Sequence, residues 1–502
     1  MMKSIIEMID DIARSHPDWP AVDVLGAVHT YGELHQAATA IAADLAARPL
    51  AAGAPIMVYC DQSFEAIATF LGCVKAGHAY IPVDTHSPSD RLVMITQIAH
   101  PALTIATVPL PIAVATPVMT PAALAQAMAA PAAVAPAVTM RWSDNFYIIF
   151  TSGTTGQPKG VQISHANLSS FVAWMTRFDL PSRARVLTQA PFSFDLSVMS
   201  LYPTLTTGGC LQVLPKETTA DLKALFKTLR DLPLEVWVST PSFIELCLLA
   251  PDFDGAHHPE LRQLYFCGEE LTHATAAKLL ERFPRAQVFN TYGPTEATVA
   301  VTAIEITPAV LAEHDRLPIG YAKPDTTLSL VPDTVRQEDG QAVGELYISG
   351  PSVSKGYLNR PDKTAAAFVS DHGEQAYRTG DLGFIASDGL IFYRGRTDFQ
   401  IKLNGYRIEL EEVNHYLNTA PMIRQAVAVP RYNAQHKVAQ MLAFVVPASD
   451  GDARELTRAI HDYLQTVMMP YMIPQRFVYR DSLPVTANGK VAIKQLIAEV
   501  NA

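Results

Sequence analysis

The clearest signal for both fold and chemistry lies in residues 147–160, which read Tyr147-Ile148-Ile149-Phe150-Thr151-Ser152-Gly153-Thr154-Thr155-Gly156-Gln157-Pro158-Lys159-Gly160. The run begins with an apolar stretch, which predicts a buried β-strand, and continues as a loop rich in glycine, serine and threonine. Glycines let backbone N–H groups turn toward an anion, hydroxyl groups add donors, and the lysine adds positive charge. We therefore predict a phosphate-binding loop, with a plain surface turn as the alternative for the loop taken alone.

The position of the lysine separates this loop from a Walker A motif. In that motif the lysine follows glycine and precedes serine or threonine, whereas Lys159 lies between Pro158 and Gly160. This difference argues against a P-loop NTPase or a kinase.

Alternating strand and helix patterns lie on both sides of the loop. Predicted strands at residues 55–59, 80–83, 103–108, 235–238, 263–266 and 287–289 are separated by predicted helices at 64–76, 91–99, 243–249 and 274–283, the last capped by Thr272. Such alternation predicts parallel sheets covered by helices. We expect an α/β fold with two sheets of this kind.

The pattern changes after residue 343. Strands at 382–386 and 390–394 are predicted to form a hairpin around Ser387-Asp388-Gly389. A small α+β unit is expected to follow, with helices at 409–417 and 455–468 and strands at 425–429, 442–446 and 476–479. We place a boundary after residue 397. Residues 1–397 would form a large N-terminal domain of layered, mostly parallel sheets with a β-rich subdomain, and residues 398–502 a small C-terminal domain.

Composition and charge argue against several kinds of partner, bound metal and targeting segment. The 502 residues include 38 Lys and Arg against 49 Asp and Glu, a net charge of −11 that repels nucleic acid. The five cysteines form no CxxC pair, which argues against a disulfide framework or a zinc site. Acidic residues near the N-terminus argue against a signal peptide. We expect a cytoplasmic protein in a reducing compartment.

Residues 101–140 carry no Asp, Glu, Lys or Arg, but they include seven prolines. A spanning helix needs about 20 apolar residues with its backbone bonded internally. We therefore predict one short strand followed by an Ala/Pro-rich surface connection, and no direct membrane insertion.

Six further motifs follow the loop in order along the chain: Asn290-Thr291-Tyr292-Gly293-Pro294-Thr295-Glu296, Gly344-Glu345-Leu346, Tyr377-Arg378-Thr379-Gly380-Asp381, Gly395-Arg396-Thr397-Asp398, Lys402-Leu403-Asn404-Gly405-Tyr406-Arg407-Ile408-Glu409 and Asn488-Gly489-Lys490. With the loop, they resemble the motifs of the adenylate-forming enzymes, which include peptide-synthetase adenylation domains, acyl-CoA ligases and luciferases. The resemblance covers essentially the whole chain and implies a mobile C-terminal domain.

The resemblance implies ATP and Mg²⁺ as cofactors and assigns roles to the motif residues. The ATP-binding set would be Thr151, Ser152, Gly153, Thr154, Thr155, Gly156, Lys159, Asn290, Thr291, Tyr292, Gly293, Pro294, Asp381, Tyr393 and Arg396. Within it, the loop would wrap the β- and γ-phosphates, Asn290 and Tyr292 would frame the adenine, and Asp381 would accept the ribose hydroxyls beside Arg396. A carboxylate suits a diol because it accepts hydrogen bonds and donates none.

Catalytic roles are implied for three further residues. Lys490 would bridge the substrate carboxylate and the α-phosphate, Thr295 would touch the α-phosphate, and Glu296 would bind Mg²⁺. Asp398 matches the hinge about which the small domain would swing to open a thiol tunnel.

The predicted substrate is an amino acid. Asp195 lies among aromatic residues in Pro191-Phe192-Ser193-Phe194-Asp195-Leu196-Ser197, where the amino-acid-activating branch pairs an aspartate with the substrate ammonium. This stretch, with Tyr265-Phe266-Cys267-Gly268-Glu269, more closely resembles the D-alanine–D-alanyl carrier protein ligases of Gram-positive bacteria. There the residue matching Cys267 narrows the pocket, and Val299 would approach the substrate.

The resemblance implies activation of D-alanine to D-alanyl-AMP, then transfer to the phosphopantetheine thiol of a D-alanyl carrier protein, supplying D-alanine for teichoic acids. We expect a monomer that meets this carrier as a separate protein. Three alternatives stay open: activation of another small amino acid, an acyl-CoA ligase, which Asp195 disfavours, and a non-catalytic nucleotide sensor. The last would require loss of Lys490, Asp381 or Glu296, and all three are present.

Overall fold

The computed structural model describes residues 3–131, 141–153, 157–338, 340–371, 374–449, 451–485 and 491–501. The chain divides into two compact units. The first consists of residues 1–85, 98–150 and 160–397, and the second of residues 86–97, 151–159 and 398–502. The division at Thr397 and Asp398 falls where the sequence motifs change, but two segments from the first half of the chain belong to the second unit.

One sheet of the first unit contains the strand that enters the predicted phosphate loop. Its strands, in spatial order, are β6 (Val118–Met119), β5 (Leu103–Ala106), β3 (Ile56–Cys60), β4 (Tyr80–Asp84), β7 (Asn145–Thr151) and β8 (Lys159–Ser164). The strands from β6 to β7 pair in parallel. Every residue of β3 and β4 is buried, as expected for strands covered on both faces.

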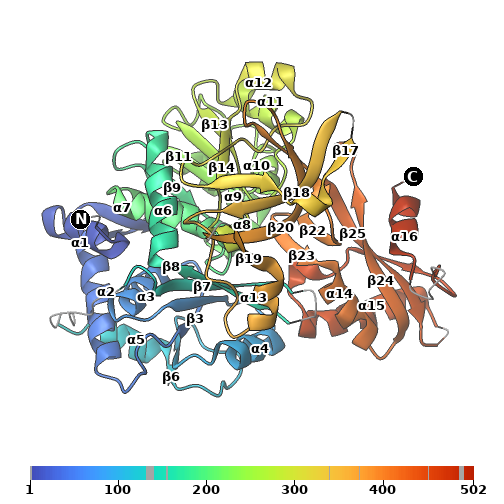
Figure 1. Cartoon of the computed structure of the whole chain (residues 1–502). Helices are drawn as coiled ribbons and strands as arrows, with labels where there is room; N and C mark the ends of the chain where they lie inside the picture. Colours follow the sequence, from blue (N-terminus) through green and yellow to red (C-terminus); the bar gives the residue numbers. More distant parts are fainter. Residues whose placement is uncertain are drawn as a thin grey trace. The chain divides into compact units, whose positions relative to one another are not determined.

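Helices α1 (Ile5–Ser15), α2 (Tyr31–Ala46) and α3 (Phe64–Lys75) pack against one another beside this sheet (Figure 1). Ser63 begins α3, because its hydroxyl accepts a hydrogen bond from the Ala66 N–H. The predicted strand, helix and strand between residues 55 and 83 are therefore confirmed. Helix α4 (Ser89–Ala99) follows, also as predicted.

The prediction for residues 101–140 was partly wrong. The strand near residue 103 is present, but the described part of the connection also contains β6 and helix α5 (Pro121–Met128). Thr120 caps α5 through the Ala123 N–H, and Pro121 occupies the first helical turn, where it costs no hydrogen bond. Among the residues that the structure describes, no helix is long and apolar enough to cross a membrane.

The second sheet of the first unit has nine strands. In spatial order they are β15 (Tyr321–Ala322), β14 (Thr302–Glu305), β13 (Gln287–Tyr292), β12 (Gln263–Phe266), β11 (Val236–Ser239), β9 (Arg185–Thr188), β10 (Cys210–Val213), β1 (Pro20–Val24) and β2 (Ala27–Thr30). From β13 to β1 the pairing is parallel. The two predicted parallel sheets are therefore present.

Helix α7 (Leu196–Thr206) connects the two sheets and is buried along its whole length. It packs on β9, β10 and β11, while its Tyr202 hydroxyl lies 2.5 Å from that of Tyr80 in β4. The other helices of this unit are α6 (His165–Met175), α8 (Lys216–Ala220), α9 (Leu222–Asp231), α10 (Pro241–Cys247), α11 (His273–Arg282), α12 (Pro308–Glu313) and α13 (Pro361–Ala367). Thr272 caps α11, as predicted.

A third, antiparallel sheet forms the β-rich part of the first unit. Its strands are β16 (Thr327–Leu330), β17 (Arg336–Glu338), β18 (Gln341–Ser349), β19 (Phe368–Asp371), β20 (Glu374–Ile385) and β21 (Ile391–Arg396). The predicted hairpin is the pair β20–β21, in which Asp381 lies opposite Arg396. Gly389 takes a left-handed φ of 89° in the connecting turn.

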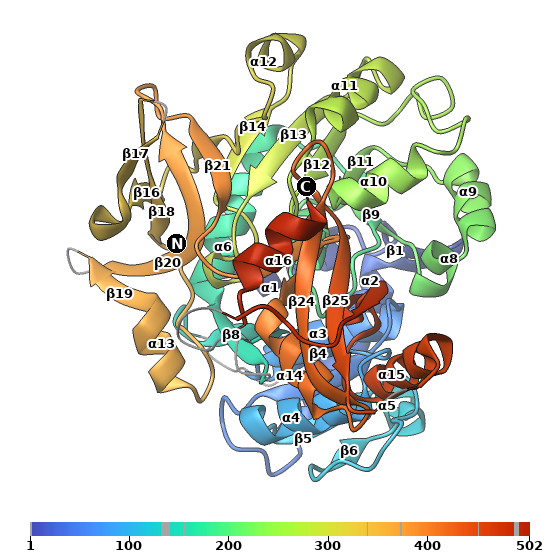
Figure 2. The same cartoon turned by 90° about the vertical axis from the view of Figure 1, so that its right-hand side faces the viewer.

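The second unit is built around a sheet of β24 (Ile423–Tyr432), β25 (Val438–Pro447) and β26 (Arg476–Tyr479), next to a hairpin of β22 (Gln400–Leu403) and β23 (Tyr406–Glu409). Helices α14 (Leu410–Thr419) and α15 (Ala453–Val467) pack on one face of this sheet. Helix α16 (Ile493–Val500) packs on the other face, in front of β24 and β25 in Figure 2. This is the α+β unit that the sequence predicted.

Candidate active site

Strand β13 carries three predicted nucleotide residues at its carboxyl end. The Asn290 amide donates to the Pro318 carbonyl at 2.7 Å, and the Thr291 hydroxyl donates to the Phe266 carbonyl at 2.9 Å. Tyr292, the last residue of the strand, points its hydroxyl toward Asp381. The carboxyl end of a parallel strand is the common place for a ligand site in such sheets.

Asp381 lies where three predicted residues meet. Its carboxylate accepts from the Tyr292 hydroxyl at 2.5 Å and from the Arg396 guanidinium at 2.6 Å, and its side chain is 4% exposed. Burial, helped by Asp381, raises the pKa of Tyr292 well above its ordinary value. Tyr292 therefore stays protonated as a donor. Tyr393 belongs to the same region, because burial and then Asp381 raise the pKa of its hydroxyl.

The turn after β13 places Glu296 in the interior. Gly293 is required there, because a Cβ would lie 2.6 Å from the Ala300 Cα. Pro294 precedes a short 3₁₀ turn, η2 (Thr295–Ala297), in which Thr295 is half-buried and Glu296 is fully buried. Glu296 Oε1 accepts from the Tyr357 hydroxyl at 2.7 Å.

The residues after η2 form a strained turn beside Cys267. Thr298 and Val299 both have left-handed backbone conformations, with φ of 59° and 69°. This is rare for a threonine and an outlier for a valine, because both side chains branch at Cβ. The Thr298 hydroxyl donates to the Ser352 carbonyl at 2.7 Å, and the Cys267 thiol donates to the Val299 carbonyl at 3.6 Å. Two predicted substrate residues, Cys267 and Val299, are thus in contact.

Asp195 precedes α7 and is the N-cap residue of that helix. It is 9% exposed, and its backbone is helical (φ −65°, ψ −17°), so it does not lie in a strand. Its carboxylate contributes, after burial, to the raised pKa of Tyr147 in β7.

In the second unit, the predicted phosphate loop binds carboxylates. The Gly153 N–H donates to Glu412 Oε2 at 3.0 Å, and Lys159 Nζ lies 3.9 Å from Glu409 Oε1. Arg91 lies 3.8 Å from Glu412. Burial raises the pKa of Glu412, against the opposing effect of Arg91. Two of the predicted donors, the Gly153 N–H and Lys159, thus face carboxylate oxygen atoms.

The backbone conformation of the loop requires a glycine at position 153. A Cβ on Gly153 would lie 1.9 Å from the Gln157 carbonyl oxygen, so no other residue fits this conformation. The Ser152 hydroxyl donates to the Arg407 carbonyl at 3.0 Å, and the Thr151 hydroxyl is buried with no hydrogen-bond partner among the described residues.

Four predicted residues, Thr154, Thr155, Gly156 and Lys490, lie outside the described residues. Asp398, the predicted hinge, is the first residue of the C-terminal segment of the second unit. Its carboxylate accepts from the Gln400 N–H at 3.2 Å.

Sequence reasoning did not identify Arg91, Tyr357 or Glu412 as contacts of the predicted residues. Glu412 lies three residues beyond the motif that ends at Glu409, in the first turn of α14. This closeness to the motif was the one sequence feature that could have identified Glu412. Nothing near Arg91 or Tyr357 in the sequence pointed to the site.

Glu296 suits Mg²⁺ by its chemistry. Magnesium commonly takes one or two carboxylates, with phosphate oxygens and waters completing its coordination. Within the described residues there is no group of three or more His, Cys, Asp or Glu side chains that would hold a metal by protein ligands alone. A single buried carboxylate suits an ion that arrives with a nucleotide and keeps phosphate oxygens and waters as its other ligands.

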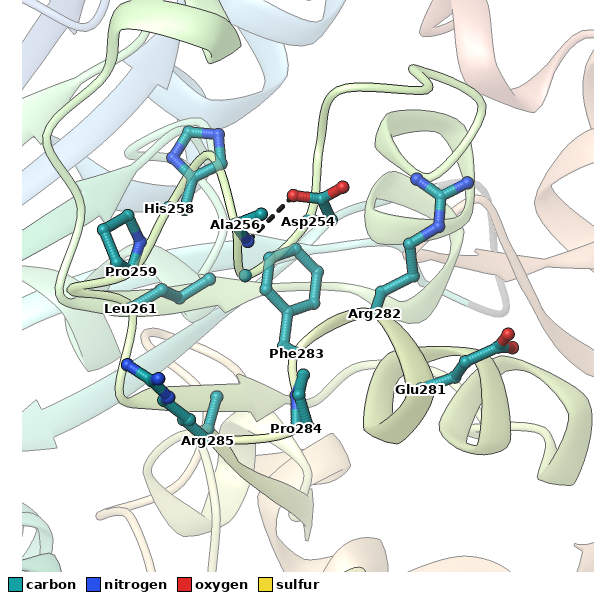
Figure 3. A pocket seen from close by; sticks show the side chains of 12 residues that line it. Asp254, Ala256, His258, Pro259, Leu261, Glu281, Arg282, Phe283, Pro284 and Arg285 are labelled. Atoms are coloured by element: carbon teal, nitrogen blue, oxygen red, sulfur yellow. Dashed lines mark hydrogen bonds between the residues drawn. The ribbon is translucent and has the colours of Figure 1, made fainter.

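A separate cavity of about 590 Å³ lies between the loop at residues 254–261 and the end of α11 (Figure 3). Asp254 accepts from the Ala256 N–H within that loop, and Phe283 lies between the loop and Pro284 in the view. No predicted site residue lines this cavity.

Two family models match the chain. The model described as AMP-binding enzyme matches residues 9–358, and the model described as AMP-binding enzyme C-terminal domain matches residues 412–490. The chain belongs to the AMP-binding enzyme family. The adenylate-forming resemblance is thereby confirmed.

Curated relatives of this AMP-binding enzyme match over its full length. A protein of Lactiplantibacillus plantarum named D-alanine–D-alanyl carrier protein ligase is 56% identical, with 100% of each chain covered. A Streptococcus pyogenes protein of the same name is 48% identical over 100% of both chains.

Solved structures show the same fold. A Bacillus subtilis o-succinylbenzoate CoA synthetase has a TM-score of 0.82 at 19% identity, covering 97% of this chain and 98% of the other. A Vibrio cholerae adenylation domain in complex with glycyl-adenosine-5′-phosphate has a TM-score of 0.81 at 23% identity, covering 100% and 98%. These matches confirm the predicted fold class.

Proposed function

We propose that this AMP-binding enzyme activates D-alanine with ATP to form D-alanyl-AMP and diphosphate. The D-alanyl group then passes to the phosphopantetheine thiol of a separate carrier protein. Two relatives that bear this ligase name share 56% and 48% of their residues with the chain over its full length. Because ATP is a cytoplasmic metabolite, we propose the cytoplasm as the location.

The observation that carries the proposal is the arrangement around the end of β13. On one side Tyr292 reaches Asp381, a buried carboxylate suited to a ribose diol. The turn that follows leads through the buried Glu296 to Val299, whose carbonyl meets Cys267. One strand end thus leads from the proposed nucleotide contacts to Cys267 and Val299, the two residues proposed to approach the substrate side chain.

In the first step, we assign the binding of ATP to two groups of donors and acceptors. Asp381 would hold the ribose, with its carboxylate oriented by Tyr292 and Arg396. The Gly153 N–H and Lys159 would bind phosphate oxygens in place of the carboxylates that they contact in the structure. Mg²⁺ bound to Glu296 would neutralise phosphate charge.

The substrate carboxylate then attacks the α-phosphorus, and the bond from that phosphorus to the departing diphosphate breaks. Asp195 would pair with the α-ammonium of the amino acid, and Thr295 and Lys490 would stabilise the negative charge that develops at the α-phosphate. We propose that residues 398–502 act as a mobile lid that swings about Asp398 to present Lys490.

In the second step, the carrier thiol loses its proton, its sulfur attacks the acyl carbon, and AMP leaves. This route needs no cysteine nucleophile on the enzyme. Cys60, Cys73, Cys210, Cys247 and Cys267 are all buried, and burial raises the pKa of the first four.

The test is ATP–diphosphate exchange with D-alanine, L-alanine, glycine and D-serine measured side by side. We expect the highest kcat/KM with D-alanine. A preference for L-alanine or glycine would refute the substrate assignment and leave adenylation standing. Transfer is tested by loading the phosphopantetheinylated carrier, with the unmodified carrier as the control, which must stay unloaded.

A further inference from the structure

The carboxylate of Glu296 is held by a tyrosine that lies 61 residues further along the chain. The Tyr357 hydroxyl donates to Glu296 Oε1 at 2.7 Å, and the two side chains are 5% and 0% exposed. Hydrogen bonds to an ionised acceptor are shorter and stronger than neutral ones. A buried carboxylate also requires such partners to remain charged.

The Glu296 backbone is fixed to the same segment. The Ser354 N–H donates to the Glu296 carbonyl at 2.8 Å, three residues before Tyr357. The main chain and side chain of Glu296 are therefore both bonded to residues 354–357. Because the last torsion of a glutamate is broad and soft, the bond from Tyr357 restricts the orientation of the carboxylate plane.

Tyr357 is itself held firmly. Its N–H donates to the Thr364 hydroxyl at 2.9 Å, and its ring packs edge-on against Phe368 at a centroid distance of 5.4 Å. Val161 in β8 forms an isolated antiparallel bridge with Tyr357. Two contacts thus fix the Tyr357 backbone and one fixes its ring, which restricts the position of its hydroxyl.

We propose that Tyr357 is a positioning residue for the magnesium ion that accompanies ATP. Its hydroxyl holds Oε1 of Glu296 and so limits the orientations of the carboxylate that would hold the ion. The inference rests on the role of Glu296 given under the proposed function. It goes further by assigning a task to a residue outside the predicted site.

The expected loss of metal affinity can be taken from groups that orient metal ligands in other proteins. Removing a group that orients a metal ligand typically weakens metal affinity 10- to 100-fold. With Glu296 as the proposed protein ligand of the ion, the loss of its orientation should lower the affinity for the ion directly. We expect a weakening of about tenfold.

The test is Tyr357→Phe in the full chain, with Mn²⁺ as the probe. Electron paramagnetic resonance would measure Mn²⁺ binding in the presence of α,β-methylene-ATP, whose bond from the α-phosphorus to the bridging carbon is not cleaved in the adenylation step. We expect Mn²⁺ affinity to fall about tenfold, while affinity for AMP without metal and the KM for D-alanine stay within twofold of the parent. In exchange assays the Mg²⁺ concentration for half-maximal activity should rise by a similar factor.

Tyr31→Phe is the matched control. Tyr31 is fully buried, and its hydroxyl donates to the Gly209 carbonyl at 2.8 Å, away from Glu296 in sequence and contacts. This variant also loses one buried tyrosine hydrogen bond, but its Mn²⁺ affinity should be unchanged. If Tyr357→Phe unfolds, Thr364→Val offers a milder loss of the same support, and it should weaken Mn²⁺ binding severalfold.

The variant Glu296→Gln distinguishes a failure of the proposed metal role of Glu296 from a failure of the proposed positioning role of Tyr357. If Glu296→Gln weakens Mn²⁺ binding and both Tyr357→Phe and Thr364→Val bind Mn²⁺ like the parent, the positioning role is refuted. If Glu296→Gln itself leaves Mn²⁺ binding unchanged, the metal role of Glu296 is wrong and the inference about Tyr357 falls with it.

Discussion

Replacing Asp381 with asparagine should remove the ability of the enzyme to recognise the ribose hydroxyls. The carboxylate accepts one bond from Tyr292 and one from Arg396, at 2.5 and 2.6 Å. Each carboxylate oxygen can accept two, so both keep a lone pair for a ribose hydroxyl. An asparagine has one acceptor oxygen, which Arg396 would claim, and its amide would donate instead.

The size of the effect follows from these bonds. A hydrogen bond to a charged group contributes about 1.5 kcal/mol or more, and about 1.4 kcal/mol is a factor of ten. The parent should therefore favour ATP over 2′-deoxy-ATP and over 3′-deoxy-ATP by about tenfold each in kcat/KM. In Asp381→Asn the kcat/KM for ATP should fall about 100-fold, and the preference over either analogue should largely disappear.

Diphosphate release with D-alanine and each nucleotide measures these ratios. Asp10→Asn is the control, because Asp10 also pairs with a buried cation, Lys75 at 2.5 Å, but on α1. It should cost stability and leave the nucleotide ratios intact. If Asp381→Asn lowers all rates equally and keeps the tenfold preference, Asp381 does not bind the ribose.

Three further predictions concern other parts of the site and core. Cys267→Ala should change the ratio of D-alanine to L-alanine kcat/KM by about tenfold in exchange assays, since a wider pocket loses roughly 1–3 kcal/mol of discrimination; an unaltered ratio would show that the thiol does not shape the pocket. Glu412→Gln should lower the KM for ATP about fivefold, because a neutral side chain competes less with phosphate for the Gly153 N–H; a raised KM would contradict this. Burial lowers the pKa of His165, which packs on Phe146, to about 4. As the pH falls, His165 is therefore protonated in the unfolded chain before it is protonated in the folded one. The free energy of unfolding should decrease between about pH 6.5 and 4, by at most about 3 kcal/mol. Urea unfolding at pH 7 and 4.5 should show a smaller loss in His165→Leu than in the parent, and an equal loss would refute the shift.

The sequence predicted the architecture well because its local signals agreed with one another. Apolar runs such as 55–59 became buried strands, here Ile56–Cys60, and caps such as Thr272 began helices where expected. Helix α5 was missed although Thr120 and Pro121 are good start signals. Its surroundings are so rich in proline that the segment was interpreted as a connection, and the helix presents only Leu124 as a buried residue.

The site was predicted only in part, because a motif shows which groups a residue offers and not which partner it meets. The pairing of Asp381 with Arg396 follows from the hairpin register, which the turn at Gly389 determines. The bond from Tyr357 to Glu296 depends on how two distant loops pack, and no local pattern encodes it. Such contacts become visible only when the fold is known.

The predicted phosphate loop is a second case in which the motif did not show which partners its residues meet. Its donors were identified from their chemistry, and in the structure two of them, the Gly153 N–H and Lys159, contact the carboxylates of Glu412 and Glu409, which lie 259 and 250 residues further along the chain. A carboxylate and a phosphate present similar oxygen atoms to the same N–H group and ammonium. The second unit therefore contains both the proposed phosphate donors and carboxylates that occupy them, and we predict that binding of ATP displaces these carboxylates. Any substitution that makes these carboxylates weaker hydrogen-bond acceptors should favour ATP binding. The direction in which Glu412→Gln changes the KM for ATP, more than the size of the change, therefore decides whether the loop binds phosphate as proposed.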